Sequence, residues 1–220
     1  MAWILRFYNS TIGMKVVMAV SGAALFAFVI IHMVGNLQVF LGEKVFNHYA
    51  EMIQGTPELL WSVRLGLLAS VIAHVVSSVR LVLLAKAARP VAYRVKQNAV
   101  TTYAARTMRF SGPIVLIYLI LHILHLTTGD IHPDFKHGDA YHNFVTAFSA
   151  DQWYIPLGYA FCQILLGLHL YHGAFSMFRT LGLSGPRQVE FARVVSHAVT
   201  AFIVIGNVLL PLSVLLGLVK

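Results

Sequence analysis

Histidine is the residue type through which this sequence could do chemistry. The chain has 11 histidines in 220 residues. An ionisable side chain in an apolar setting is costly, and it usually marks a cofactor, a proton path or an ion path. A single such histidine is a packing residue, hydrogen-bonded between helices, about as often as it is a functional one. Seven need another explanation, and seven lie in long apolar runs: His32, His74, His122, His125, His169, His172 and His197.

The apolar runs that carry these histidines are long enough to cross a membrane. About 20 apolar residues cross a bilayer as a helix, and each run reaches that length. Hydrophobic residues make up 58% of the chain and charged residues only 11%, less charge than a soluble domain of this size exposes. The sequence therefore predicts an all-α, single-domain membrane protein over residues 1–220, with five spans at Val16–Leu41, Leu59–Ala85, Phe110–Gly129, Gln152–Phe178 and Val194–Val219.

Basic residues collect on one side of the predicted spans. Twelve of the 16 lie in the segment up to Lys15, in Arg80–Arg109 and in Arg179–Arg193, where Glu190 is the only acid. The other acids lie on the opposite side. The positive-inside rule then predicts a cytoplasmic N-terminus and an external C-terminus. The net charge of +8 is thus explained by membrane topology, and no nucleic-acid partner is expected.

Helix geometry places two of the histidines at one depth. With a rise of about 1.5 Å per residue, His74 lies about 9 Å inward from Arg80, and His172 lies about 10 Å inward from Arg179. These two residues belong to the second and fourth spans. Two imidazoles that face each other at one depth can ligate the iron of a b-type haem. The sequence therefore predicts an inner haem layer.

A second layer is predicted deeper in the membrane. His32 lies about 25 Å from Lys15, and His122 lies about 20 Å from Arg109. These residues belong to the first and third spans, so this layer is also supplied by two helices. An iron-bound imidazole is neutral and therefore less costly to bury. The two layers together predict a bundle with two haems stacked across the membrane.

Two of the predicted ligands have a second histidine three residues away. The segments "LHILH" (Leu121–His125) and "LHLYH" (Leu168–His172) each offer two candidates about 60° apart around the helix. Spacing alone leaves both open in each segment. A haem-free transporter of metal ions or protons is the other interpretation of the histidines, although transporters more typically show acids in the spans or broken helices.

The chain resembles a known family over nearly its whole length. The motifs that carry the resemblance are "SGAALFAFVIIHMVGNLQVF" with "FNHYAE", then "VIAHVVSSVRL", "TMRFSGPIVLIYLILHILHLTTG" and "LHLYHGAFSMFRTLG". In this order they are similar to the single-chain, five-helix, di-haem cytochrome b subunits of succinate dehydrogenases and fumarate reductases. The resemblance implies His74 and His172 as ligands of the inner haem and His32 and His122 as ligands of the outer one. It selects against His125 and His169.

The resemblance also implies a function shared with other subunits. Similar proteins anchor a flavoprotein and an iron–sulfur protein on the cytoplasmic face of the inner membrane of a prokaryote, and exchange electrons with menaquinone or ubiquinone. The chain has one cysteine, Cys162, and no nucleotide-binding glycine loop, so it is not expected to oxidise succinate alone. No catalytic residue is assigned. A b-type cytochrome anchor of a hydrogenase or formate dehydrogenase shares the same histidine pattern.

Polar residues near the span ends have two interpretations each. Arg80 could pair with a haem propionate, or it could be a snorkelling topology anchor. The others could serve a quinone pocket, a proton path, a propionate or a surface metal, and are otherwise solvated or packing side chains. They are His48, Glu58, Arg64, His132, His137, His142 and His197.

Overall fold

A computed structural model of the chain describes residues 2–89, 91 and 102–220. Every regular element in these residues is a helix, and five helices are long and apolar enough to cross a membrane. This confirms the predicted all-α fold with five spans. The five helices are α2 (Thr11–Asn36), α4 (Pro57–Ala87), α5 (Tyr103–Leu126), α7 (Tyr154–Thr180) and α8 (Pro186–Leu215).

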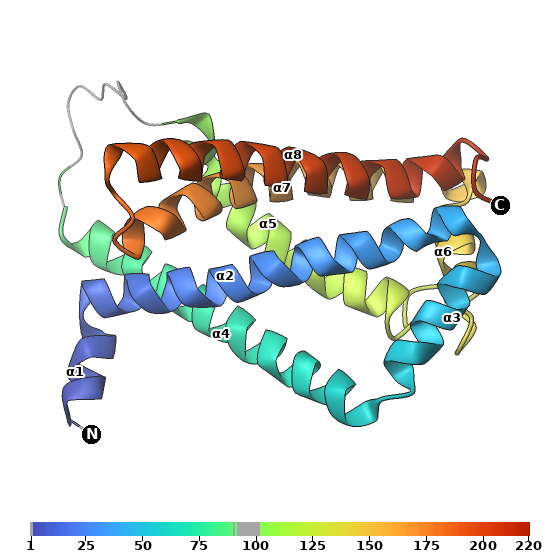
Figure 1. Cartoon of the computed structure of the whole chain (residues 1–220), viewed down its shortest axis with the longest axis horizontal. Coiled ribbons are helices and arrows are strands. Elements are labelled where there is room, and N and C mark those ends of the chain that lie inside the picture. Colours follow the sequence, from blue (N-terminus) through green and yellow to red (C-terminus); the bar gives the residue numbers. More distant parts are fainter. Residues whose placement is uncertain (1, 90, 92–101) are drawn as a thin grey trace.

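The long helices form an elongated bundle whose two chain ends lie far apart (Figure 1). α7 packs along α8, and α2 packs along α4. α7 also contacts both α5 and α2, so it connects the two pairs. α4 and α5 run obliquely to α2 in Figure 1. The helices that carry the predicted ligands, α2, α4, α5 and α7, are therefore in contact through α2 and α7.

The helix starts are explained by local sequence. Ser10 before α2 and Thr102 before α5 each accept a hydrogen bond from the backbone N–H three residues further on. Such side-chain caps satisfy a backbone donor that the first turn leaves unpaired. α4 and α8 begin instead with Pro57 and Pro186, whose ring fixes a helical φ and whose missing N–H is not needed in the first turn.

Shorter helices lie at both ends of the bundle and were not predicted as elements. They are α1 (Ala2–Asn9), α3 (Glu43–Gln54) and α6 (Ala140–Ala147), together with the 3-10 turns η1 (Leu37–Leu41) and η2 (Ala150–Gln152). A search for long apolar runs misses them because they are short, and α3 and α1 are amphipathic. η1 continues α2, so the first membrane span reaches Leu41 as predicted.

The two ends of the bundle differ in charge. We call the end with α1, the start of α2 and the Arg179–Arg193 segment the basic end, and the end with α3 and α6 the acidic end.

α3 and α6 are joined by Asn47, whose amide donates to Asp139 at 3.0 Å and accepts from the Tyr141 backbone at 2.8 Å. Arg94 and Lys96, which contributed to the predicted cytoplasmic charge, lie outside the described residues.

The outward faces of the long helices are apolar. Ile31 on α2, Leu65 on α4, Phe161 on α7 and Ile205 on α8 are each more than half exposed. A soluble bundle would place polar side chains at such positions, whereas a bilayer accepts them. The surface is therefore that expected of an integral membrane protein.

Candidate functional site

The two predicted outer ligands are in contact. His32 on α2 and His122 on α5 have ring centroids 5.9 Å apart, with an interplanar angle of 87°. Phe28 stacks on His32 at 5.3 Å, and Tyr118 lies 5.8 Å from His122. The spacing of four residues in each helix places Phe28 and Tyr118 one turn before the histidine that they contact. Aromatic rings therefore hold both imidazoles in place.

The hydrogen bonds of this outer pair leave ring nitrogens for a ligand. His122 Nδ1 is buried and has no partner among the described residues. A buried polar atom without a partner is uncommon and indicates a missing ligand, water or ion. His32 Nε2 lies 3.2 Å from the amide nitrogen of Asn36, one turn further along α2. Iron ligation through Nε2 would replace this bond.

A second pair of histidine rings joins α4 to α7. His74 lies beside His169, with centroids 6.1 Å apart and an interplanar angle of 60°. From here on, His74 and His169 are the inner pair, and His32 and His122 are the outer pair. His74 Nδ1 donates to the carbonyl oxygen of Met18 on α2 at 3.0 Å. This bond fixes the tautomer, because Nε2 of the neutral ring then carries the free lone pair. Histidines that bind a metal usually donate their other ring nitrogen to such an acceptor.

Glycines make room around the inner pair. A Cβ on Gly22 of α2 would lie 3.2 Å from the His74 ring, which is closer than ordinary packing contact. A Cβ on Gly112 of α5 would lie 3.9 Å from His169. His169 Nδ1 is buried and has no partner among the described residues. The space beside the two rings is therefore bounded by backbone on two further helices.

Both pairs fit the geometry of one metal ion between two imidazoles. A metal–nitrogen bond of about 2 Å on each side places the two ring centroids roughly 6 Å apart. The observed separations are 5.9 Å and 6.1 Å. Imidazole is a common axial ligand of haem iron. The imidazole donors and these separations therefore allow one axially ligated haem iron in each pair.

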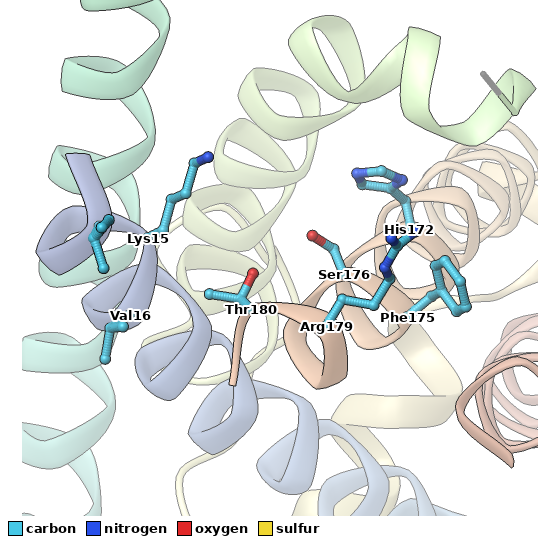
Figure 2. A pocket seen from close by; sticks show the side chains of 8 residues that line it. Lys15, Val16, His172, Phe175, Ser176, Arg179 and Thr180 are labelled. Atoms are coloured by element: carbon cyan, nitrogen blue, oxygen red, sulfur yellow. The ribbon is translucent and has the colours of Figure 1, made fainter. Parts of the chain in front are cut away.

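His172, the inner ligand that the resemblance implies, borders a cavity. This cavity of about 500 Å³ lies at the basic end, between α2 and α7. Figure 2 shows Lys15 on one side of this cavity and Ser176, Arg179 and Thr180 on the other. Of the two histidines in "LHLYH", the structure thus places His169 against His74 and His172 among cationic and hydroxyl groups.

Arg80 is engaged with α1. Its guanidinium donates to the side-chain oxygen of Asn9 at 2.9 Å and lies over the ring of Tyr8 at 5.3 Å. These contacts tie α1 to α4. The cations that border a cavity near the inner pair are Lys15 and Arg179.

Of the remaining sequence candidates, all except the buried His132 are exposed or partly exposed. His48, Glu58 and Arg64 are exposed. His197 is also exposed; its Nδ1 donates to the Arg193 carbonyl at 2.8 Å, and its ring lies 4.5 Å from Tyr171. The loop histidines His132, His137 and His142 form no group of three metal-binding side chains within the described residues.

A buried polar chain beside the outer pair was not predicted. The Gln163 amide on α7 donates to the Tyr118 hydroxyl at 2.6 Å and accepts from Asn207 of α8 at 3.1 Å. A glutamine and an asparagine inside apolar spans are the signal that could have identified it, since polar groups at that depth must find partners. These hydrogen bonds link α5, α7 and α8 next to His122.

Comparisons of the chain with protein-family models, with curated proteins and with solved structures found no match.

Proposed function

We propose that this protein is the membrane-anchor subunit of a succinate:quinone oxidoreductase or quinol:fumarate reductase. In this proposal it holds two b haems in a cytoplasmic membrane and links an iron–sulfur subunit to membrane quinone. The observation that carries the proposal is the presence of two facing histidine pairs, each contributed by two helices, in one five-span bundle. The class of oxidoreductase, the partner subunits and the quinone are proposed from the resemblance of the histidine-bearing motifs to the di-haem cytochrome b subunits.

The residues that would hold the cofactors are His32 and His122 in the outer layer and His74 and His169 in the inner layer. The inner assignment differs from the one that the resemblance implies, because His169 is the ring that faces His74. A bound haem iron supplies reversible one-electron transfer between Fe²⁺ and Fe³⁺. The chain supplies the axial imidazoles, the Met18 carbonyl that orients His74, and an apolar surrounding that excludes water.

The cavity at the basic end supports the same proposal. It begins one turn beyond His169, at His172, and continues to Arg179. Lys15, Ser176, Arg179 and Thr180 offer two cations and two hydroxyls there, a set that suits carboxylates. We therefore propose this cavity, and not Arg80, as the place for the propionates of the inner haem.

The orientation and the partners follow from the same scheme. The basic end would face the cytoplasm, where the flavoprotein and iron–sulfur subunits would dock. The inner pair would then be the one closer to the iron–sulfur subunit. The outer pair would be the one closer to the external face.

An absorption spectrum of the purified complex tests the proposal directly. Dithionite reduction should produce the sharp bands of b haem, and a pyridine haemochrome assay should give two haems per chain. A covalent-flavin protein and an iron–sulfur protein should copurify. A haem-free protein would mean that the histidines serve a transporter. A haem protein that copurifies with hydrogenase or formate dehydrogenase subunits would belong to another oxidoreductase.

A further inference from the structure

The acidic end buries two histidines that the proposed haem sites do not use. His125 is on α5, and His132 is in the connection between α5 and α6. They are 5% and 6% exposed, and their ring centroids lie 5.0 Å apart. Two buried imidazoles in contact need a reason, because each brings polar nitrogens into an apolar surrounding.

Hydrogen bonds determine which nitrogen of His132 carries its proton. The Thr146 hydroxyl donates its only proton to the carbonyl of His142 at 2.8 Å. It must therefore accept from His132 Nε2, which lies 3.0 Å away. His132 Nδ1 then keeps its lone pair, and this atom is buried without a partner among the described residues. Burial lowers the pKa of His132, so the neutral ring offers a vacant proton acceptor at neutral pH.

From His132 the polar groups continue inward to the outer pair. His125 Nδ1 is hydrogen-bonded to the Tyr159 hydroxyl of α7 at 2.9 Å. The Tyr159 ring lies 6.1 Å from His122, a proposed outer ligand. Phe148 covers this line of groups, with its ring 4.8 Å from Tyr159 and 6.3 Å from His125. An aromatic side chain thus packs against both His125 and Tyr159.

At its outer end the line meets charged groups that are open to water. Asp134 in the same connection and His142 on α6 act electrostatically on His132, and His132 acts in the same way on His125 of α5. His142 Nε2 bonds to the Asp134 carbonyl at 3.0 Å, and Lys136 lies 3.5 Å from His142 Nδ1. Asp134 and Lys136 are exposed, so charged groups of the same connection lie in water at the acidic end.

We propose that His132 and His125, with Tyr159 holding His125, conduct protons between the water at the acidic end and a quinone that reacts beside the outer pair. An imidazole suits this role because it accepts a proton at one nitrogen and releases one at the other. Reduction of a quinone to quinol takes up two electrons and two protons, one of each for each carbonyl oxygen. The electrons would come from the iron–sulfur subunit and the protons from the acidic end, so the inference rests on the proposed function.

The test uses the complete complex in membranes. In His132→Gln, the glutamine amide can still donate to Thr146, but it cannot relay a proton. Succinate should reduce both haems as fast as in the unchanged protein, while turnover with quinone should fall about 10-fold or more. Added imidazole should restore much of the turnover in His132→Ala. His137→Gln is the matched control, because His137 is exposed in the same connection, and it should turn over normally.

Two results would overturn the proton path. One is equal turnover in the His132→Gln and His137→Gln complexes. The other is a parallel loss of haem reduction and quinone turnover that imidazole does not restore, which would give His132 a structural role. Failure of the proposed function is distinguishable, since the unchanged complex would then lack haem bands or succinate-dependent haem reduction.

Discussion

At the scale of single residues, the histidines differ in their hydrogen-bond partners. His74 is oriented by a backbone carbonyl, which is the arrangement that metal-binding imidazoles use. His125 is bonded to Tyr159 and faces another histidine. His169 Nδ1 has no partner in the described residues. These hydrogen-bond partners cannot be predicted from residue type and sequence spacing, because all of these side chains are imidazoles in apolar helices.

The two histidines of "LHLYH" are expected to behave differently when replaced. His169→Ala should lose the inner haem, because it removes the ring that faces His74, and a pyridine haemochrome assay should fall from two haems per chain to one. His172→Ala is the control; it should keep two haems and change only the potential of the inner one. One haem in His172→Ala and two in His169→Ala would restore the assignment that the family resemblance implies.

At the scale of helices, small residues set how closely the bundle packs. α7 and α8 are in the most extensive contact, and Gly167 of α7 faces Val204 of α8. A Cβ on Gly167 would come within 2.4 Å of the Val204 side chain. Glycines and other small residues allow such close approach of membrane helices. This close contact with α8 constrains the rotation of α7, the helix that carries His169 and His172.

Gly167→Ala is expected to destabilise the bundle. Overpacking of this kind typically costs about 1–3 kcal/mol, so thermal unfolding in detergent should shift to lower temperature. Gly158→Ala, in the same helix with open space around it, should be neutral or slightly stabilising. Truncation of the partner in Gly167→Ala/Val204→Ala should recover part of the loss. Equal melting of the two glycine variants would mean that the α7–α8 contact is not tight.

At the scale of the whole molecule, charge is divided between the two ends of one bundle. The chain termini lie at opposite ends, as an odd number of spans requires (Figure 1). The basic end carries the proposed propionate cavity, and the acidic end carries the proposed proton path. Electron entry and proton exchange would therefore take place on opposite sides of the membrane.

Single-cysteine labelling can test this orientation. In a Cys162→Ser background, Lys136→Cys at the acidic end should react with an impermeant maleimide applied to cells from outside. Ser184→Cys at the basic end should react only after the membrane is opened, because the positive-inside rule places it in the cytoplasm. Both native residues are exposed, so access within the protein does not limit labelling. The reverse pattern would invert the topology and with it the assignment of the inner and outer pairs.

The sequence by itself determined the five spans, the charge asymmetry and the presence of histidines at two depths. These follow from composition and from the rise per residue, which do not depend on how helices pack. His32 and His122 were predicted as neighbours on this basis, and they are in contact. Short helices such as α3 and α6 were not predicted from the sequence, because their stability comes from contacts with each other and with the bundle.

Only the tertiary structure shows which ring of "LHLYH" lies beside His74, and it is that of His169. Distance along a helix equals depth only when helices run parallel from anchors at the same level, but α4 and α5 run obliquely to α2 (Figure 1). The two histidines differ by three residues, about 4.5 Å of rise and about 60° of rotation. A small tilt or rotation of α7 exchanges them. Packing against α8 and α2 sets that tilt and rotation, so the ring that meets His74 depends on contacts between segments far apart in the chain.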